Sequence, residues 1–160
     1  MNKIQSLAVT VALLFNVGCT TSLDSYRKET GYEKPHTVEG YHHFAGWCKK
    51  TGRIEDQIWA HQEAVRKLPN GSEAEITERI ELGQSYLTLL KDFQLNISTN
   101  RYSSDVKDTW IKARNKCVEA KENSNLIPPK EIRFYGTREE IDYLCDKFNH
   151  QKTFRDFQTF

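Results

Sequence analysis

The sequence predicts an all-α protein, a small antiparallel bundle of about four to five helices behind a flexible N-terminal tether. Apolar residues recur at spacings of four and three in several segments, which is the period of one helix face. No run of β-branched residues alternates strictly with polar residues, so strands are not expected. With 160 residues and 38% hydrophobic content, the chain has room for one domain with a narrow core.

The first two helices are expected between residues 38 and 68. The earlier one has a short apolar stripe at i, i+3, i+4 and i+7, formed by Tyr41, Phe44, Ala45 and Cys48. The later one has spacings of 4, 3, 4 and 3 between Ile54, Ile58, His61, Val65 and Leu68. A Pro-Asn-Gly sequence follows directly and ends this helix.

A third helix is expected to begin at a capping box formed by Ser72 and Glu75. Its stripe repeats the 4, 3, 4, 3 spacing through Ile76, Ile80, Gly83, Leu87 and Leu90. Residues 96–104 are polar and rich in turn formers, which predicts a loop. The next helix has the same spacing through Val106, Trp110, Ala113, Cys117 and Ala120, and residues 123–129 end it.

A last helix is expected to begin at a second capping box, formed by Thr137 and Glu140. Its stripe consists of Ile141, Leu144, Cys145 and Phe148. The apolar segment at residues 132–135 is too short to assign. Matching stripes and short connections favour an antiparallel bundle within one chain. Coiled-coil pairing with a partner chain is the alternative.

The N-terminus carries a pattern of another kind. Lys3 precedes an apolar run over residues 7–15, which is too short to cross a bilayer because a spanning helix needs about 20 residues. A short apolar run behind a lysine and before a small residue is typical of an export signal. Val17, Gly18 and Cys19 follow the run.

These residues resemble the lipobox of bacterial lipoprotein precursors, in which a small residue precedes a modified cysteine. Asn16 stands where that motif usually has leucine. The resemblance implies removal of residues 1–18, diacylglycerol on the thiol of Cys19 and acylation of its amino group. Because Thr20 rather than Asp follows, it also implies the periplasmic side of the outer membrane. Cleavage by an ordinary signal peptidase, or an uncleaved apolar helix in a cytosolic chain, is the alternative.

The chain is therefore expected to have four parts. They are a signal peptide (1–18), a lipidated N-terminus with a flexible tether (19–36), a helical domain (37–150) and an aromatic tail (151–160). The tether is expected because residues 20–35 are polar and lack sustained periodicity. It would hold the helical domain away from the membrane.

An exported chain meets an oxidising compartment, where disulfides persist. With Cys19 lipidated, three thiols remain, enough for one bridge and one leftover. Cys117 and Cys145 lie on the apolar faces of successive expected helices and are the preferred pair, with Cys48 and Cys117 as the second choice. The leftover thiol is expected to be a buried small apolar group, and an intermolecular bridge is the alternative.

No residue pattern predicts catalysis, a metal or a cofactor. His42, His43, Cys48 and His61 lack the spacing of a zinc site, and His61 is interpreted as a core histidine. Acidic pairs stand in first helical turns, where capping and the helix dipole explain them. Lys and Arg number 23 against 22 Asp and Glu, and this balance argues against a nucleic-acid partner.

Aromatic side chains are the candidates for contact with a partner protein. Trp59 lies just off its helix seam, and the tail carries Phe154, Phe157 and Phe160. The alternative for the tail is that its rings fold back onto the bundle. The other tryptophans, Trp47 and Trp110, are expected in the core.

These features favour a non-catalytic lipoprotein that binds or guides another protein. Its partners would be the lipid bilayer, through Cys19, and an envelope protein or an incoming foreign protein. Size, anchor and fold class are similar to those of pilotins, which escort secretin subunits to the outer membrane, and an exclusion or immunity lipoprotein fits equally. The alternatives are an envelope enzyme that acts on cell wall or lipid and a structural spacer in an envelope complex.

Overall fold

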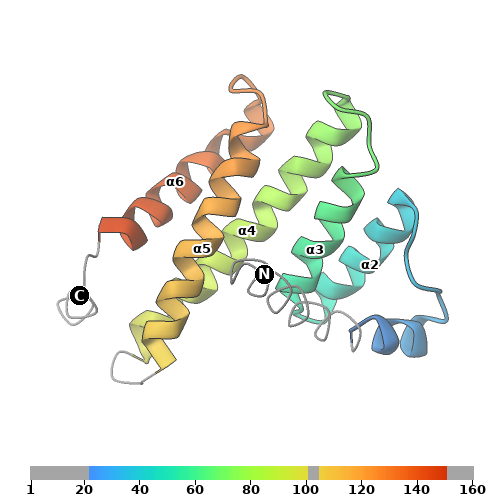
Figure 1. Cartoon of the computed structure of the whole chain (residues 1–160), viewed down its shortest axis with the longest axis horizontal. Coiled ribbons are helices and arrows are strands. Elements are labelled where there is room, and N and C mark those ends of the chain that lie inside the picture. The colour runs from blue at the N-terminus through green and yellow to red at the C-terminus, as the bar shows by residue number, and fades with distance from the viewer. Residues whose placement is uncertain (1–21, 101–104, 151–160) are drawn as a thin grey trace, which may run out of the picture. The chain divides into compact units, whose positions relative to one another are not determined.

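The computed structural model describes residues 22–100 and 105–150, and these residues form helices and loops without any strand (Figure 1). The predicted all-α class is confirmed. The chain divides into two compact units, unit 1 (Met1–Ala64) and unit 2 (Val65–Phe160), which are described separately. Cys19 and the phenylalanines of the tail, at 154, 157 and 160, lie outside the described residues.

Unit 1 contains a helical segment at residues 22–30, then α2 (Val38–Lys50) and α3 (Ile54–Val65), which ends at the unit boundary. Figure 1 shows α2 and α3 running in opposite directions on either side of the turn 51–53. The side chain of Thr37 caps α2 by accepting a hydrogen bond from the backbone N–H of Gly40 at 3.1 Å. Both helices predicted for this part of the sequence are confirmed.

The expectation of a flexible tether is wrong for residues 22–30, which are helical. Leu23 is 8% exposed and Tyr26 is 1% exposed. They belong to the core cluster of unit 1, whose buried members are Leu23, Tyr26, Tyr41, Phe44, Ala45, Trp47, Cys48, Ala60 and Ala64. Leu23 and Tyr26, three positions apart, dock this short helix on the apolar surface of α2 and α3. A helix that depends on only two apolar side chains has too few of them to show a helical period in the sequence.

Unit 2 contains α4 (Glu73–Thr99), α5 (Asp105–Asn125), the short 3-10 helix η1 (Ile132–Phe134) and α6 (Tyr135–His150). The three α-helices pack pairwise against one another, and each runs opposite to the one before it (Figure 1). The fully buried large side chains of unit 2 are Tyr86, Leu90, Val106, Ile127, Phe134 and Ile141. The predicted antiparallel packing is present within this unit.

The start of α4 is the predicted cap with one variation. The Ser72 hydroxyl accepts a hydrogen bond from the Glu75 N–H at 3.1 Å, as expected, but the Glu75 carboxylate accepts from the N–H of Gly71 rather than from that of Ser72. The end of α4 differs from the prediction, because the helix continues through the expected loop as far as Thr99. Ile97 is buried there, so the apolar stripe extends about two turns beyond Leu90, the last residue that suggested it.

The predicted capping box at Thr137 is wrong. Helix α6 begins at Tyr135, directly after η1, and Thr137 lies inside it. The cap belongs to η1 instead, where the Glu131 side chain accepts a hydrogen bond from the N–H of Arg133. Phe134 is completely buried and packs against α4 at Gly83, so the chain is held before α6 begins.

Candidate functional site

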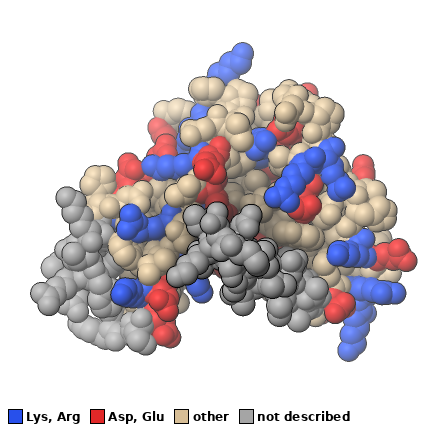
Figure 2. Space-filling view, viewed as in Figure 1, with Lys and Arg blue, Asp and Glu red and all other residues tan. Residues whose placement is uncertain are grey.

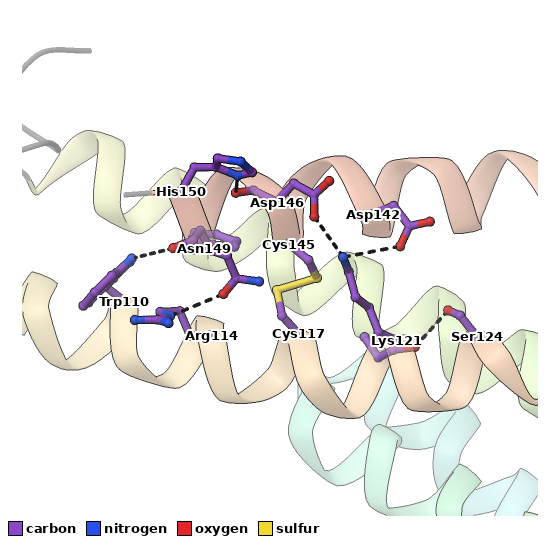
Figure 3. The surroundings of a disulfide bond; sticks show 12 residues. Trp110, Arg114, Cys117, Lys121, Ser124, Asp142, Cys145, Asp146, Asn149 and His150 are labelled. Atoms are coloured by element: carbon purple, nitrogen blue, oxygen red, sulfur yellow. Dashed lines mark hydrogen bonds and ion pairs between the residues drawn. A yellow bond between two sulfur atoms is a disulfide. The ribbon is translucent and has the colours of Figure 1, made fainter. Parts of the chain in front are cut away.

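Unit 2 holds the predicted disulfide. Cys117 of α5 and Cys145 of α6 are bonded, with their Cα atoms 5.3 Å apart and both side chains buried (Figure 3). The preferred pairing is confirmed. Cys48 is the cysteine of the described residues that forms no disulfide, and it is completely buried in unit 1, also as predicted.

Polar contacts on either side of the disulfide join the same two helices (Figure 3). The indole N–H of Trp110 donates to the backbone carbonyl of Phe148 at 3.2 Å, and Nζ of Lys121 donates to Asp146 at 2.9 Å. The guanidinium of Arg114 lies over the Trp110 ring at 4.9 Å. This side of unit 2 is therefore a crosslinked helix pair.

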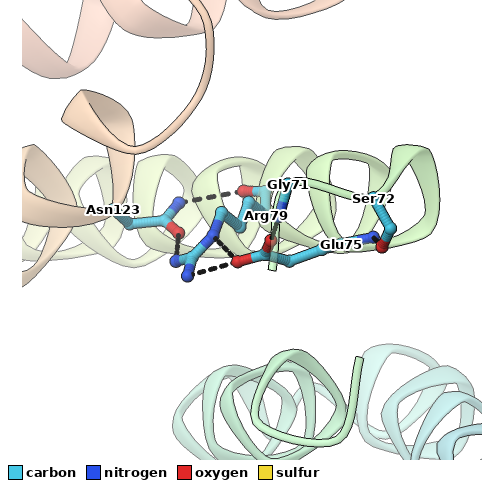
Figure 4. A network of polar contacts seen from close by, with 5 residues as sticks. All are labelled: Gly71, Ser72, Glu75, Arg79 and Asn123. Atoms are coloured by element: carbon cyan, nitrogen blue, oxygen red, sulfur yellow. Dashed lines mark hydrogen bonds and ion pairs between the residues drawn. The ribbon is translucent and has the colours of Figure 1, made fainter. Parts of the chain in front are cut away.

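A second polar network joins α4 to α5 (Figure 4). Arg79 forms an ion pair with Glu75 at 2.7 Å, and the Asn123 amide donates to the backbone carbonyl of Arg79 at 2.9 Å. Burial alone would raise the pKa of Glu75, but the hydrogen bond from Gly71 and the Arg79 guanidinium outweigh it and hold this pKa below its ordinary value. Because both carboxylate oxygens already have partners, the network is a structural tie.

Unit 1 contains an aromatic hollow, defined here as the depression lined by Tyr26, Tyr32, Pro35, Gly40 and His43, together with adjacent residues. Tyr26 and Tyr32 stack with their ring centroids 6.3 Å apart, and the Tyr32 and His43 rings lie 4.2 Å apart. The hydroxyl of Tyr26 is hydrogen-bonded to Nδ1 of His43 at 2.9 Å. Burial raises the pKa of Tyr26, so this phenol keeps its proton.

The outer ring of the aromatic hollow is accessible, while the ring that supports it is buried. Tyr32 is 53% exposed, whereas Tyr26 beneath it is buried. Sequence reasoning missed this site because both tyrosines lie in the segment interpreted as a tether. The available indication was the presence of two aromatic residues six positions apart in an otherwise polar stretch.

The structure does not place Trp59 as an exposed anchor. It is only partly exposed and packs against the unit 1 core, in edge-to-face contact with Tyr41 at 5.7 Å and Phe44 at 5.9 Å. Trp59 lies off the seam of its helix, which suggested exposure, but from this position its ring points toward α2. Trp47 and Trp110 are buried, as predicted.

Charged and titratable side chains occur in both units of the described ranges. His61 is buried, as expected for a core histidine. Within residues 22–100 and 105–150, no three His, Cys, Asp or Glu side chains converge as metal ligands. On the face seen in Figure 2, Lys and Arg side chains are interspersed with Asp and Glu. Among the helices described, none is both long and apolar enough to cross a bilayer.

Comparison of the chain with protein-family models, with curated proteins and with solved structures found no match.

Proposed function

We propose that the chain is a membrane-anchored lipoprotein that acts by binding another protein, on the periplasmic side of the outer membrane. The observation that carries the proposal is the leader, in which a short apolar run is followed by Val17, Gly18 and Cys19. Several acyl chains on one cysteine would anchor it in effect permanently, because each buried CH₂ contributes about 0.8 kcal/mol.

The disulfide between Cys117 and Cys145 supports export, because such bonds persist in the periplasm and are rare in the cytosol. The aromatic hollow supports a binding role. An exposed Tyr32 stacked on a buried Tyr26 presents an aromatic ring to a partner, and protein interfaces favour aromatic anchors that lose little conformational entropy on binding. The partner we propose is an envelope protein that the lipoprotein escorts or an incoming foreign protein that it blocks.

The anchor is tested by growing cells with labelled palmitate. The wild-type chain is expected to incorporate the label and to fractionate with the outer membrane, and Cys19→Ser is expected to abolish both. Cys48→Ser is the matched control, because it removes a cysteine that forms no disulfide and leaves the leader intact. Equal labelling of wild type and Cys19→Ser, or no labelling of the wild type, contradicts the proposal.

The binding role is tested with a photoreactive amino acid at Tyr32 in intact cells. The matched control is the same substitution at Tyr143, a tyrosine of α6 that is 64% exposed. One discrete crosslinked protein at position 32, absent at position 143, is expected, and its identity separates an envelope subunit from a foreign protein. Identical products at both positions contradict a role for the aromatic hollow.

A further inference from the structure

The side chain of Ser22 fixes the first described residue within unit 1. Its hydroxyl donates to the Asp56 carboxylate at 2.5 Å and accepts a hydrogen bond from Nη1 of Arg53 at 2.9 Å. Ser22 is 2% exposed, and Leu23 after it lies in the core cluster. The path of the chain from the membrane therefore becomes fixed at Ser22 and not at the end of a long tether.

Thr20 and Thr21 are the only residues between Ser22 and Cys19. Three steps along a fully extended chain cover at most about 11 Å. A diacylated Cys19 sits at the level of the lipid headgroups, because its acyl chains enter the hydrocarbon. The end of unit 1 that carries Ser22 must then lie within that reach of the headgroups.

This end of unit 1 consists of the last turn of α2, the turn 51–53 and the first turn of α3. It carries the basic residues Lys49, Lys50 and Arg53 and the acidic residues Glu55 and Asp56. Both lysines are exposed, and the turn folds back so that the Arg53 N–H donates to a carbonyl of α2. The Asp56 carboxylate is already engaged by the buried serine, so the exposed charges of this end are two lysines and one glutamate, Lys49, Lys50 and Glu55, with a net positive charge.

We infer that this end of unit 1 lies against the bilayer that holds Cys19, with Lys49 and Lys50 facing the lipid phosphates. The inference rests on the proposed function, since it requires acylation at Cys19. Ammonium groups near an anionic headgroup surface are attracted to it within a Debye length. The two residues between Cys19 and Ser22 keep this end of unit 1 close to the headgroups, and the lysines give it positive charge that attracts phosphate.

The test uses the full-length lipidated protein in vesicles of phosphatidylethanolamine and phosphatidylglycerol that contain a headgroup-linked nitroxide. A fluorophore is attached at Lys50→Cys or, as matched control, at Glu39→Cys. Both positions are exposed on α2 and lie roughly 16 Å apart along the helix. Quenching is expected to be stronger at position 50. Cys48 is buried and does not take the label in the folded protein.

A third protein carries twelve Gly and Ser residues inserted between Thr21 and Ser22. This spacer adds roughly 20 Å of flexible reach and is expected to abolish the difference in quenching between positions 50 and 39. Equal quenching at the two positions without the spacer, or stronger quenching at position 39, overturns the inference. Palmitate incorporation is measured on the same samples, so a missing lipid, which is failure of the proposed function, is distinguished from a lipidated protein with another orientation.

Discussion

Removal of the Cys117–Cys145 disulfide is the perturbation whose effect on stability can be worked out most directly. The bond closes a loop with a sequence separation of 28 residues, and for a loop of that size the chain-entropy model gives about 3.5 kcal/mol of stabilisation. Domains of this size unfold with about 5–15 kcal/mol, so the bond supplies a large share of the total. The substitution Cys117→Ala with Cys145→Ala keeps both buried positions small and apolar.

The assay is urea unfolding followed by far-UV circular dichroism, on protein carrying Cys19→Ser to keep it free of lipid. With a denaturant slope of about 1–3 kcal/mol per molar urea, the midpoint is expected to fall by about 1–3 M. Dithiothreitol is expected to lower the wild-type midpoint by a similar amount and to leave the double variant unchanged. An equal midpoint for the oxidised wild type and the double variant would refute the argument.

Cys48→Ala is the control for the identity of the pair. Its unfolding midpoint is expected to remain sensitive to dithiothreitol, because Cys48 lies in unit 1 and forms no disulfide, whereas the bond lies in unit 2. If the sensitivity to reductant disappeared in this variant, the bridge would involve Cys48, and the pairing in the structure would be wrong.

Three further substitutions test the packing and the polar network. Gly83→Ala is expected to lower the free energy of unfolding by about 1–3 kcal/mol, since a Cβ there would lie 2.6 Å from Cζ of the buried Phe134 ring. Gly46→Ala lies in a helix, and its added Cβ would have no neighbouring atom within 4 Å, so it is expected to raise the free energy of unfolding by about 1 kcal/mol. The same urea titrations compare the two glycine variants. Because the folded-state pKa of Glu75 is lowered, its stabilisation is present above the ordinary glutamate pKa and is lost as the pH falls through the folded-state value. Glu75→Gln also weakens the contact with Arg79. It is therefore expected to reduce the free energy of unfolding at pH 7 and to make this free energy depend less steeply on pH at acidic pH. A pH dependence as steep as that of the wild type would contradict this role.

The helices of unit 2 could be predicted because their stripes are long. Four or five apolar residues at helical spacing identify α4 and α5 whatever packs against them. The start of α6 could not be predicted in the same way. A Thr-x-x-Glu pattern is favourable at a helix start, but burial of Phe134 already fixes the chain one turn earlier, and tertiary packing outweighs a local cap.

The candidate site was less predictable than the fold, for a related reason. The pairing of Cys117 with Cys145 followed from two apolar faces on successive helices, information that is local to each helix. The aromatic hollow depends on which α2 residues meet Tyr26 and Tyr32, and neither tyrosine belongs to a long stripe. Trp59 shows the converse, because a ring just off one helix seam still packs against the core when a neighbouring helix covers that side.

The fold of residues 22–30 also changes what the proposed anchor would do. A tether ending near residue 36 would let the domain sample a wide range of distances from the membrane, because a flexible chain spreads with the square root of its length. A chain that is fixed at Ser22 by Asp56 and Arg53 has no such freedom. The nine helical residues span roughly 13 Å, so Tyr32, two positions after them, stays within a short distance of the same anchor. Under the proposed acylation, a protein bound at the aromatic hollow would therefore be held beside the bilayer, which suits a partner that is delivered to the membrane or arrives through it.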